Sequence, residues 1–151
     1  MTVFLIRHGH AGDRGAWSSD DRLRPLSRRG FAQAERIATL LGEMPINVVR
    51  SSPAIRCLQT VAPLARVRMC TVESDARLFE GSDAESALDL IDEFADDYIA
   101  LCSHGDVIPE LIDLLRARGV PSDGRGCEKG SIWQLDREGK IITNAVYLGR
   151  P

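Results

Sequence analysis

The chain has only three histidines, and two of them stand together near its start. Arg7, His8 and His10 follow a short apolar run in the stretch FLIRHGHAG. His104 follows a second apolar run in the stretch CSHGD. Ligands of α/β proteins bind beyond the carboxyl ends of strands, where loops lead into helices. We therefore expect the three imidazoles to lie on one side of a sheet.

A third group of polar residues follows another predicted strand. Ser51, Ser52 and, one turn later, Arg56 come after residues 46–49. Two arginines and two histidines that meet beside helix N-termini would form a site for an anion with two or three charges. Phosphate fits such a site best, because its oxygens match guanidinium groups and backbone N–H groups.

The same groups suggest a reaction. A neutral imidazole can attack phosphorus and form a phosphohistidine, which divides one difficult hydrolysis into two easier steps. The surrounding cations would stabilise the charge on the equatorial oxygens in the transition state. For His8 to attack, its reacting nitrogen must be unprotonated, and the flanking cations lower its pKa. We expect its other ring nitrogen to donate to a backbone carbonyl, which fixes the tautomer.

The elements that must position these residues alternate between strand and helix. Strands are predicted at residues 2–6, 46–49, 69–73, 98–102, 131–136 and 141–147. Helices are predicted after an N-cap at Ser27, after Ser52 with Pro53 as first helical residue, from a Ser82–Glu85 capping box, and from Asp106 to about residue 118. Residues 9–25 have no hydrophobic period and are predicted to form a long loop.

Hydrophobic spacing predicts the buried face of each of the first three helices. The stripes are Phe31, Ala34, Ile37, Ala38 and Leu41; Ile55, Leu58, Val61, Ala62 and Ala65; and Leu88, Ile91 and Phe94. This alternation predicts an α/β fold in three layers, with a mostly parallel central sheet flanked by helices. With 151 residues, the chain is expected to form a single domain, 1–151.

Composition narrows the classes of protein. The net charge of −3 and the pI of about 5.6 argue against a general nucleic-acid binder. No apolar run approaches the roughly 20 residues that cross a bilayer, and the first residues lack the pattern of a signal peptide. We therefore expect a cytoplasmic monomer. The four cysteines are widely spaced, which predicts reduced thiols and neither a disulfide nor a zinc site.

Five stretches resemble, in order, the motifs of a known family. They are LIRHGHA, LSRRGFAQAE, SSPAIRCLQT, RLFEG and CSHGDVIPELI, and they resemble the histidine phosphatase superfamily, which is also called phosphoglycerate mutase-like. The resemblance spans essentially the whole chain. The small size and the R-H-G-x-A form resemble the compact SixA type of phosphohistidine phosphatase. DVIPELI and KGSIW are also similar to the phosphatase domain fused to MutT-type Nudix enzymes, although no Nudix domain is present here.

The resemblance implies a role for each matching residue. His8 would be the nucleophile that becomes phosphorylated, with Gly9 leaving room for the phosphate. Arg7, Arg56 and His104 would bind the phosphoryl oxygens. The resemblance implies no cofactor and no metal.

Further residues are candidates around this centre. Glu80, in RLFEG, falls where the family often carries the general acid that protonates the leaving group and later activates water; it is otherwise a solvated loop residue. The candidate substrate-binding residues are Gly9, His10, Ser51, Gly105, Arg22 and Lys129. The arginine-rich loop that contains Arg22, together with Lys129, either holds outer phosphates of a substrate or is simply a solvated surface.

The function expected from this reading is hydrolysis of a phosphomonoester or phosphoramidate through a covalent phosphohistidine. A protein phosphohistidine is slightly favoured as substrate, because a chain of this size lacks lid insertions; a nucleotide or other small phosphorylated metabolite is the alternative. Mutase activity is not expected. Two other classes stay open: a metal-dependent hydrolase that uses His8, His10, His104 and Asp106, which leaves the arginines unexplained, and a non-catalytic phosphate-binding module.

Overall fold

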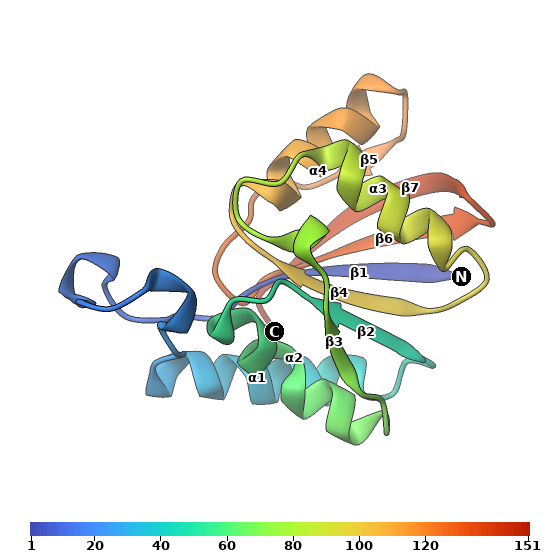
Figure 1. Ribbon diagram of the computed structural model, residues 1–151. Coiled ribbons are helices and arrows are strands. Elements are labelled where there is room, and N and C mark those ends of the chain that lie inside the picture. The colour runs from blue at the N-terminus through green and yellow to red at the C-terminus, as the bar shows by residue number, and fades with distance from the viewer.

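A computed structural model describes residues 1–151 as one seven-stranded sheet with helices on both faces (Figure 1). The strands are β1 (Thr2–Arg7), β2 (Val48–Ser51), β3 (Val72–Ser74), β4 (Ile99–Ser103), β5 (Ser122–Asp123), β6 (Ile132–Glu138) and β7 (Ile141–Gly149). The α-helices are α1 (Arg28–Leu41), α2 (Ile55–Val67), α3 (Ala84–Glu93) and α4 (Val107–Ala117). Three single turns of 3-10 helix are η1 (Arg14–Ala16), η2 (Asp21–Leu23) and η3 (Ala76–Leu78). The predicted three-layer α/β fold is confirmed.

The strand order brings the predicted polar groups to one edge. The sheet runs β3-β2-β4-β1-β6-β7-β5, and β1 to β4 are parallel where they pair. Strand β6 is antiparallel to β1, with Ile132 opposite Ile6. The carboxyl ends of β1, β2 and β4 and the beginning of β6 therefore meet at the same edge of the sheet.

The core has two halves, one on each face of the sheet. In β1, Val3 and Leu5 pack on the side of α3 and α4, whereas Phe4 and Ile6 pack on the side of α1 and α2. All five residues of β4 are buried, as expected for a central strand that is covered on both faces. Helices α1 and α2 lie below the sheet in Figure 1, and α3 and α4 lie above it.

The predicted start of α2 was wrong. Its N-cap is Ala54, which makes no side-chain capping bond, and the helix begins at Ile55. The hydroxyl of Ser52 lies 2.8 Å from Nε2 of His104 instead, and it accepts only a long bond of 3.3 Å from the Ala54 N–H. The Ser52 hydroxyl therefore contacts His104, which directly follows β4, and Pro53 precedes the helix.

The predicted capping box of α3 was also wrong. Asp83 is the N-cap, and its carboxylate accepts from the Ser86 N–H at 2.8 Å. The Ser82 hydroxyl donates to the Ala76 carbonyl, and Glu85 forms an ion pair with Arg118. By contrast, Asp106 caps α4 as predicted.

Two of the predicted helix faces were partly wrong. Phe31 is 46% exposed, while the neighbouring Gln33 is buried. The reason is polar: Oε1 of Gln33 accepts from the His10 N–H at 2.7 Å and so fixes the start of the long loop. In α2, Cys57 and Leu64 are fully buried in place of Ile55, Leu58 and Ala62, which are half-buried.

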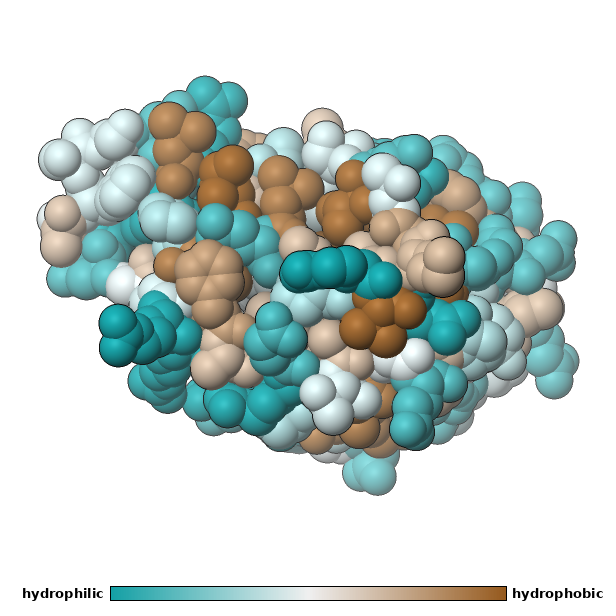
Figure 2. All heavy atoms as spheres, turned by 90° about the horizontal axis from the view of Figure 1, so that it is seen from below, coloured by the Kyte–Doolittle hydropathy of each residue, from teal (hydrophilic) through white to brown (hydrophobic).

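None of the helices combines the length and the apolar character that a membrane span requires. Figure 2 views the molecule from the side of α1 and α2, where hydrophobic and hydrophilic atoms are mixed. Large apolar side chains exposed on or beside these two helices are Phe31, Leu40, Val67 and Met69. Exposed apolar side chains of this kind are normal in globular proteins.

Candidate active site

A polar cavity of about 380 Å³ lies where the strand ends meet. Its lining contains no hydrophobic residue and consists of Arg7, His8, Gly12, Arg14, Arg24, Glu80, His104, Gly105, Asp106 and Lys129. We call it the histidine pocket. Four permanently basic side chains and two carboxylates face this space, so it suits an anionic ligand.

His8 follows β1 directly and is 5% exposed. Its backbone N–H donates to the Ser103 carbonyl at 3.1 Å, and its Nδ1 lies 2.8 Å from the Gly9 carbonyl. Because a carbonyl only accepts, Nδ1 carries the proton and Nε2 keeps a free lone pair. The expected backbone partner of His8 is therefore present.

The pKa of His8 is lowered to about 3. Burial is the largest cause, and the hydrogen bond to the Gly9 carbonyl opposes it. His104, Arg56 and Arg7 lower the pKa further by smaller amounts. The flanking cations expected from the sequence do lower the pKa of His8, but burial lowers it more. At neutral pH the imidazole is uncharged.

Arg56 is the second residue of α2 and is 1% exposed. Its Nη1 donates to the Asp21 carbonyl at 2.8 Å, and its Nη2 lies 3.2 Å from the Asp21 carboxylate and 3.8 Å from Glu80. Its buried Nε has no hydrogen-bond partner in the protein. Arg56 is not one of the residues that line the histidine pocket, but it places a positive charge next to it, because its Nη2 lies 3.5 Å from His104.

Arg7 is held in place from two sides. Its Nη1 donates to the Cys127 carbonyl at 2.7 Å, and its buried Nε has no partner. A Cβ on Gly105 would lie 2.7 Å from Cζ of Arg7, so the absence of a side chain there makes room for the guanidinium. Gly9 differs from expectation: a Cβ there would meet Gln33 and Gly30 of α1 at 3.1 Å, so its small size serves helix packing.

His104 lies beside His8, with ring centroids 5.4 Å apart. Its Nδ1 is 3.5 Å from Nη2 of Arg56, and its Nε2 lies 2.8 Å from the Ser52 hydroxyl. Because a hydroxyl can either donate or accept, the contact with Ser52 orients the ring of His104 and is compatible with either tautomer.

The Glu80 carboxylate reaches the pocket from the loop after η3. It pairs with Arg14 at 2.8 Å. The loop itself is fixed by Asp106, whose Oδ2 accepts from the Gly81 N–H at 2.8 Å while its Oδ1 accepts from the Val107 N–H. Asp106 thus connects the Glu80 loop to the start of α4.

The sequence singled out neither Asp21 nor Arg14, and it placed Arg24 only in the arginine-rich loop. Arg14 and Arg24 line the pocket, and Asp21 is the ion-pair partner of both. Asp21 lies 2.9 Å from Arg24, 3.2 Å from Arg56 and 3.6 Å from Arg14. Burial raises the pKa of Asp21, but the bond from Arg24 and the charges of Arg56 and Arg14 outweigh it, so the net pKa is lowered. The loop has no period that would reveal such a centre, although its wealth of charged residues was a signal.

Four of the six substrate-binding candidates do not line the histidine pocket: Gly9, which packs against α1, and Arg22, Ser51 and His10. Arg22 pairs with Asp20 at 2.7 Å on the exposed side of the loop. The Ser51 hydroxyl is buried and donates to the Ser52 carbonyl. The imidazole of His10 contacts the Ser27 hydroxyl at 2.7 Å. Gly105 and Lys129 do line the pocket.

The residues of a metal site are not brought together. His10 contacts Ser27 while His8 lies in the pocket, so the H-x-H pair is divided. No three histidine, cysteine or carboxylate side chains are grouped so that they could hold a metal ion. All four cysteines are free thiols.

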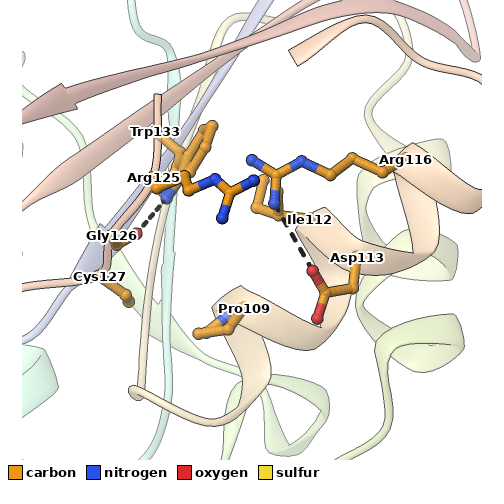
Figure 3. A pocket seen from close by; sticks show the side chains of 8 residues that line it. All are labelled: Pro109, Ile112, Asp113, Arg116, Arg125, Gly126, Cys127 and Trp133. Carbon is orange, nitrogen blue, oxygen red and sulfur yellow. Dashed lines mark hydrogen bonds and ion pairs between the residues drawn. The ribbon is translucent and has the colours of Figure 1, made fainter. Parts of the chain in front are cut away.

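A larger cavity, of about 510 Å³, lies between α4 and the segment that leads into β6 (Figure 3). It is lined by Pro109, Ile112, Asp113, Arg116, Arg125, Gly126, Cys127 and Trp133. The Trp133 Nε1 donates to the Gly126 carbonyl at 2.9 Å, and Arg116 lies 3.6 Å from Asp113. The cavity contains no histidine. Its relevance to the histidine pocket is Cys127, whose carbonyl holds Arg7.

Comparison with known proteins gives the family. Residues 3–85 match the model of the histidine phosphatase superfamily (branch 1). The chain belongs to the histidine phosphatase superfamily, as the motifs predicted.

One curated relative matches almost the whole chain. It is the 8-oxo-(d)GTP phosphatase of Mycolicibacterium smegmatis, which is 34% identical over 156 residues. The match covers 99% of this chain and 48% of the relative, so the chain spans about half the length of that protein.

Solved structures match the fold. The protein histidine phosphatase SixA complexed with tungstate gives a TM-score of 0.77 at 20% identity, over 97% of this chain and 94% of that one. The SixA of Agrobacterium tumefaciens gives a TM-score of 0.73 at 26% identity, over 90% of this chain and 91% of that one. The predicted resemblance to compact SixA proteins is confirmed.

Proposed function

We propose that this chain hydrolyses phosphomonoesters or phosphoramidates through a covalent phosphohistidine on Nε2 of His8. The observation that carries the proposal is the buried, neutral imidazole of His8. Its Nδ1 is committed to the Gly9 carbonyl at 2.8 Å, and its pKa is about 3, so Nε2 offers a lone pair at neutral pH. Such a nitrogen is a nucleophile that needs no further base.

In the first step Nε2 of His8 bonds to phosphorus while the bond from phosphorus to the leaving group breaks. Arg7 and His104 line the pocket with His8, and Arg56 lies 3.5 Å from His104; we assign these three groups to the phosphoryl oxygens, where they stabilise the charge that develops. Glu80, which pairs with Arg14 in the free protein, acts in its protonated form: when the anionic substrate replaces it as the partner of Arg14, the carboxyl group takes up a proton from solvent and donates it to the leaving group.

In the second step water attacks the phosphorus of the phosphohistidine. The bond from Nε2 of His8 to phosphorus breaks, and phosphate is released. Glu80 accepts a proton from the attacking water, so that both His8 and Glu80 return to their starting states. The proposal needs no metal, no cofactor and no second copy of the chain.

For the substrate, the geometry favours a small, multiply charged metabolite, with a nucleotide as first candidate. Lys129 adds to the pocket a positive charge that no carboxylate neutralises, whereas Arg14 and Arg24 line it as partners of Glu80 and Asp21. The mycobacterial relative carries the name of a nucleotide phosphatase. The second candidate is a protein phosphohistidine, which the sequence slightly favoured; the similarity in size and fold to SixA supports it.

The test is phosphate release by the purified protein in excess EDTA. The panel contains p-nitrophenyl phosphate, a phosphohistidine peptide, nucleoside phosphates and sugar phosphates, and His8→Ala protein is measured in parallel. We expect turnover that resists EDTA and is lost in His8→Ala. Turnover that EDTA abolishes, or that His8→Ala retains, would contradict the covalent mechanism, and silence across the panel would favour a binding module. The order of kcat/KM across the panel identifies the substrate class.

A further inference from the structure

A second, smaller pocket adjoins the histidine pocket. Its volume is about 250 Å³, and it is lined by Arg7, His10, Arg29, Gln33, Glu128, Lys129 and Arg150. Arg7 and Lys129 line both pockets, so the two spaces are neighbours. We call it the second pocket. None of its lining residues is hydrophobic.

The charges of the second pocket are not balanced. It contains four permanently basic side chains and a single carboxylate, Glu128, which pairs with Arg150 at 3.2 Å. No carboxylate lies within ion-pair distance of Lys129 or Arg29. Burial, followed by the charges of Arg7, Arg24, Arg29 and Arg14, lowers the pKa of Lys129. An anion bound here would relieve this mutual repulsion.

These cations are more than one phosphoryl group needs. Arg7, Arg56 and His104 are already assigned to the group that reacts with His8. Lys129 lies at the boundary between the pockets, and Arg29 lies only in the second. A second anionic group on the same substrate would therefore find its own donors beyond Lys129.

We propose that the second pocket binds a second phosphate of the substrate, so that the enzyme selects compounds with two phosphate groups over those with one. This inference rests on the proposed function. The second phosphate is either bonded to the first through a shared oxygen or carried elsewhere on the same small molecule. Lys129 contacts both phosphates, and Arg29 contacts only the second.

The first experiment compares AMP, ADP and adenosine 3′,5′-bisphosphate at one fixed ionic strength, because salt screens such contacts. We expect kcat/KM to be at least tenfold higher for one of the two doubly phosphorylated compounds than for AMP. Preference for ADP would place the phosphates next to each other, and preference for the bisphosphate would separate them. Equal kcat/KM values for all three would overturn the inference.

Two adjacent arginines of α1 provide a matched pair of variants. Both side chains are exposed, but Arg29 lines the second pocket whereas Arg28 lines neither pocket. We expect Arg29→Ala to reduce the preference for the doubly phosphorylated compound at least fivefold, through KM, and Arg29→Lys to restore part of it. Arg28→Ala should keep the preference of the wild type. Equal preferences in Arg29→Ala and Arg28→Ala would contradict the role of Arg29.

A binding measurement separates this inference from the proposed function. In a His8→Asn background, which cannot form the phosphohistidine, calorimetry compares pyrophosphate with orthophosphate. We expect pyrophosphate to bind at least tenfold more tightly, and Arg29→Ala to remove most of this difference. If the wild-type protein shows no turnover but this difference in affinity is found, the second pocket is supported and the proposed hydrolysis is not. If the wild-type protein turns over substrate but pyrophosphate binds no more tightly than orthophosphate, the hydrolysis is supported and the second pocket is not.

Discussion

At the scale of single residues, the nucleophilic role that we propose for His8 rests on where its two ring nitrogens lie. Nδ1 is satisfied by the Gly9 carbonyl, and the ring is 5% exposed, so a proton on Nε2 would be a buried charge among Arg7, Arg56 and His104. The same burial that keeps the nucleophile neutral also makes the folded state sensitive to acid.

We predict that His8 reduces stability as the pH falls below about 6.5. Its pKa is about 3 in the folded chain and 6.5 in the unfolded chain, so between these values only the unfolded chain binds the proton. Stability is therefore complete above the unfolded pKa and falls by about 1.4 kcal/mol per pH unit below it. Between pH 7 and pH 5 the wild type should lose about 2 kcal/mol more than His8→Asn, measured by urea unfolding. Parallel losses in the two proteins would refute this prediction.

A second prediction at this scale concerns the proton that Glu80 supplies. Glu80→Gln should slow the hydrolysis of alkyl phosphates, whose leaving groups have a high pKa, far more than that of p-nitrophenyl phosphate. The reason is that p-nitrophenolate leaves readily without a proton, whereas an alkoxide does not. The measurement is kcat for both substrates in wild type and variant. Equal losses on the two substrates would remove Glu80 as the acid.

At the scale of elements, the pocket depends on how closely neighbouring segments approach. Gly105, at the start of the turn into α4, faces the Arg7 guanidinium, and a Cβ there would lie 2.7 Å from Cζ of Arg7. Gly30, in α1, faces the chain after β1, where a Cβ would lie 2.0 Å from the His10 carbonyl oxygen. One contact involves a side chain and the other a backbone, so the two substitutions have different effects.

We predict that Gly105→Ala mainly affects activity. It displaces the Arg7 guanidinium from the Cys127 carbonyl, and kcat/KM should fall by about 10- to 100-fold with a small change in stability. Gly30→Ala must move backbone and should destabilise the fold by about 1–3 kcal/mol. Activity assays combined with thermal unfolding separate the two effects. A Gly105→Ala protein with wild-type kcat/KM would show that the position of Arg7 is not critical.

The elements also explain how far the sequence could predict this molecule. Buried strands such as β4 are continuous apolar runs, and a parallel sheet gathers their polar ends, so His8, Arg56 and His104 could be placed together in advance. The N-caps of the helices could not be predicted in the same way. The sequence suggested that the Ser52 hydroxyl caps a helix, but in the fold this hydroxyl contacts His104, which is distant in sequence. Asp21 was missed for the same reason, because its partners are distant in sequence and its loop has no period.

At the scale of the whole molecule, Arg137 of β6 joins the sheet to the end of α3. It is 3% exposed, and it donates to the carbonyls of Ile91 at 2.8 Å and Asp97 at 2.7 Å and to that of Phe94. These carbonyls end α3 and form the turn that leads into β4. A single buried guanidinium thus satisfies three backbone acceptors far from the histidine pocket.

We predict that Arg137→Met destabilises the protein by about 1–3 kcal/mol, because the Asp97 carbonyl loses its donor, while those of Ile91 and Phe94 each lose one of two donors and keep the backbone N–H of Phe94 and of Asp97. The kcat of the protein that remains folded should stay near that of the wild type. Arg118→Met is the control, since Arg118 forms an exposed ion pair with Glu85 whose loss should cost less than about 1 kcal/mol. Denaturant unfolding measures both. Equal losses in the two variants would contradict the importance of the buried bonds.

Because β6 is antiparallel to β1, the residues that line the pocket come from two kinds of segment. The groups around the reacting phosphoryl follow the parallel strands, whereas Cys127, Glu128 and Lys129 arrive on one short connection that enters β6 from the opposite direction. This connection is also tied to the first strand: the Gly130 N–H donates to the carbonyls of Arg7 and His8, and the Cys127 carbonyl accepts from the Arg7 guanidinium. A change in the length of this connection would therefore move His8 together with the cations, whereas exchange of the exposed Glu128 side chain would leave these backbone bonds intact.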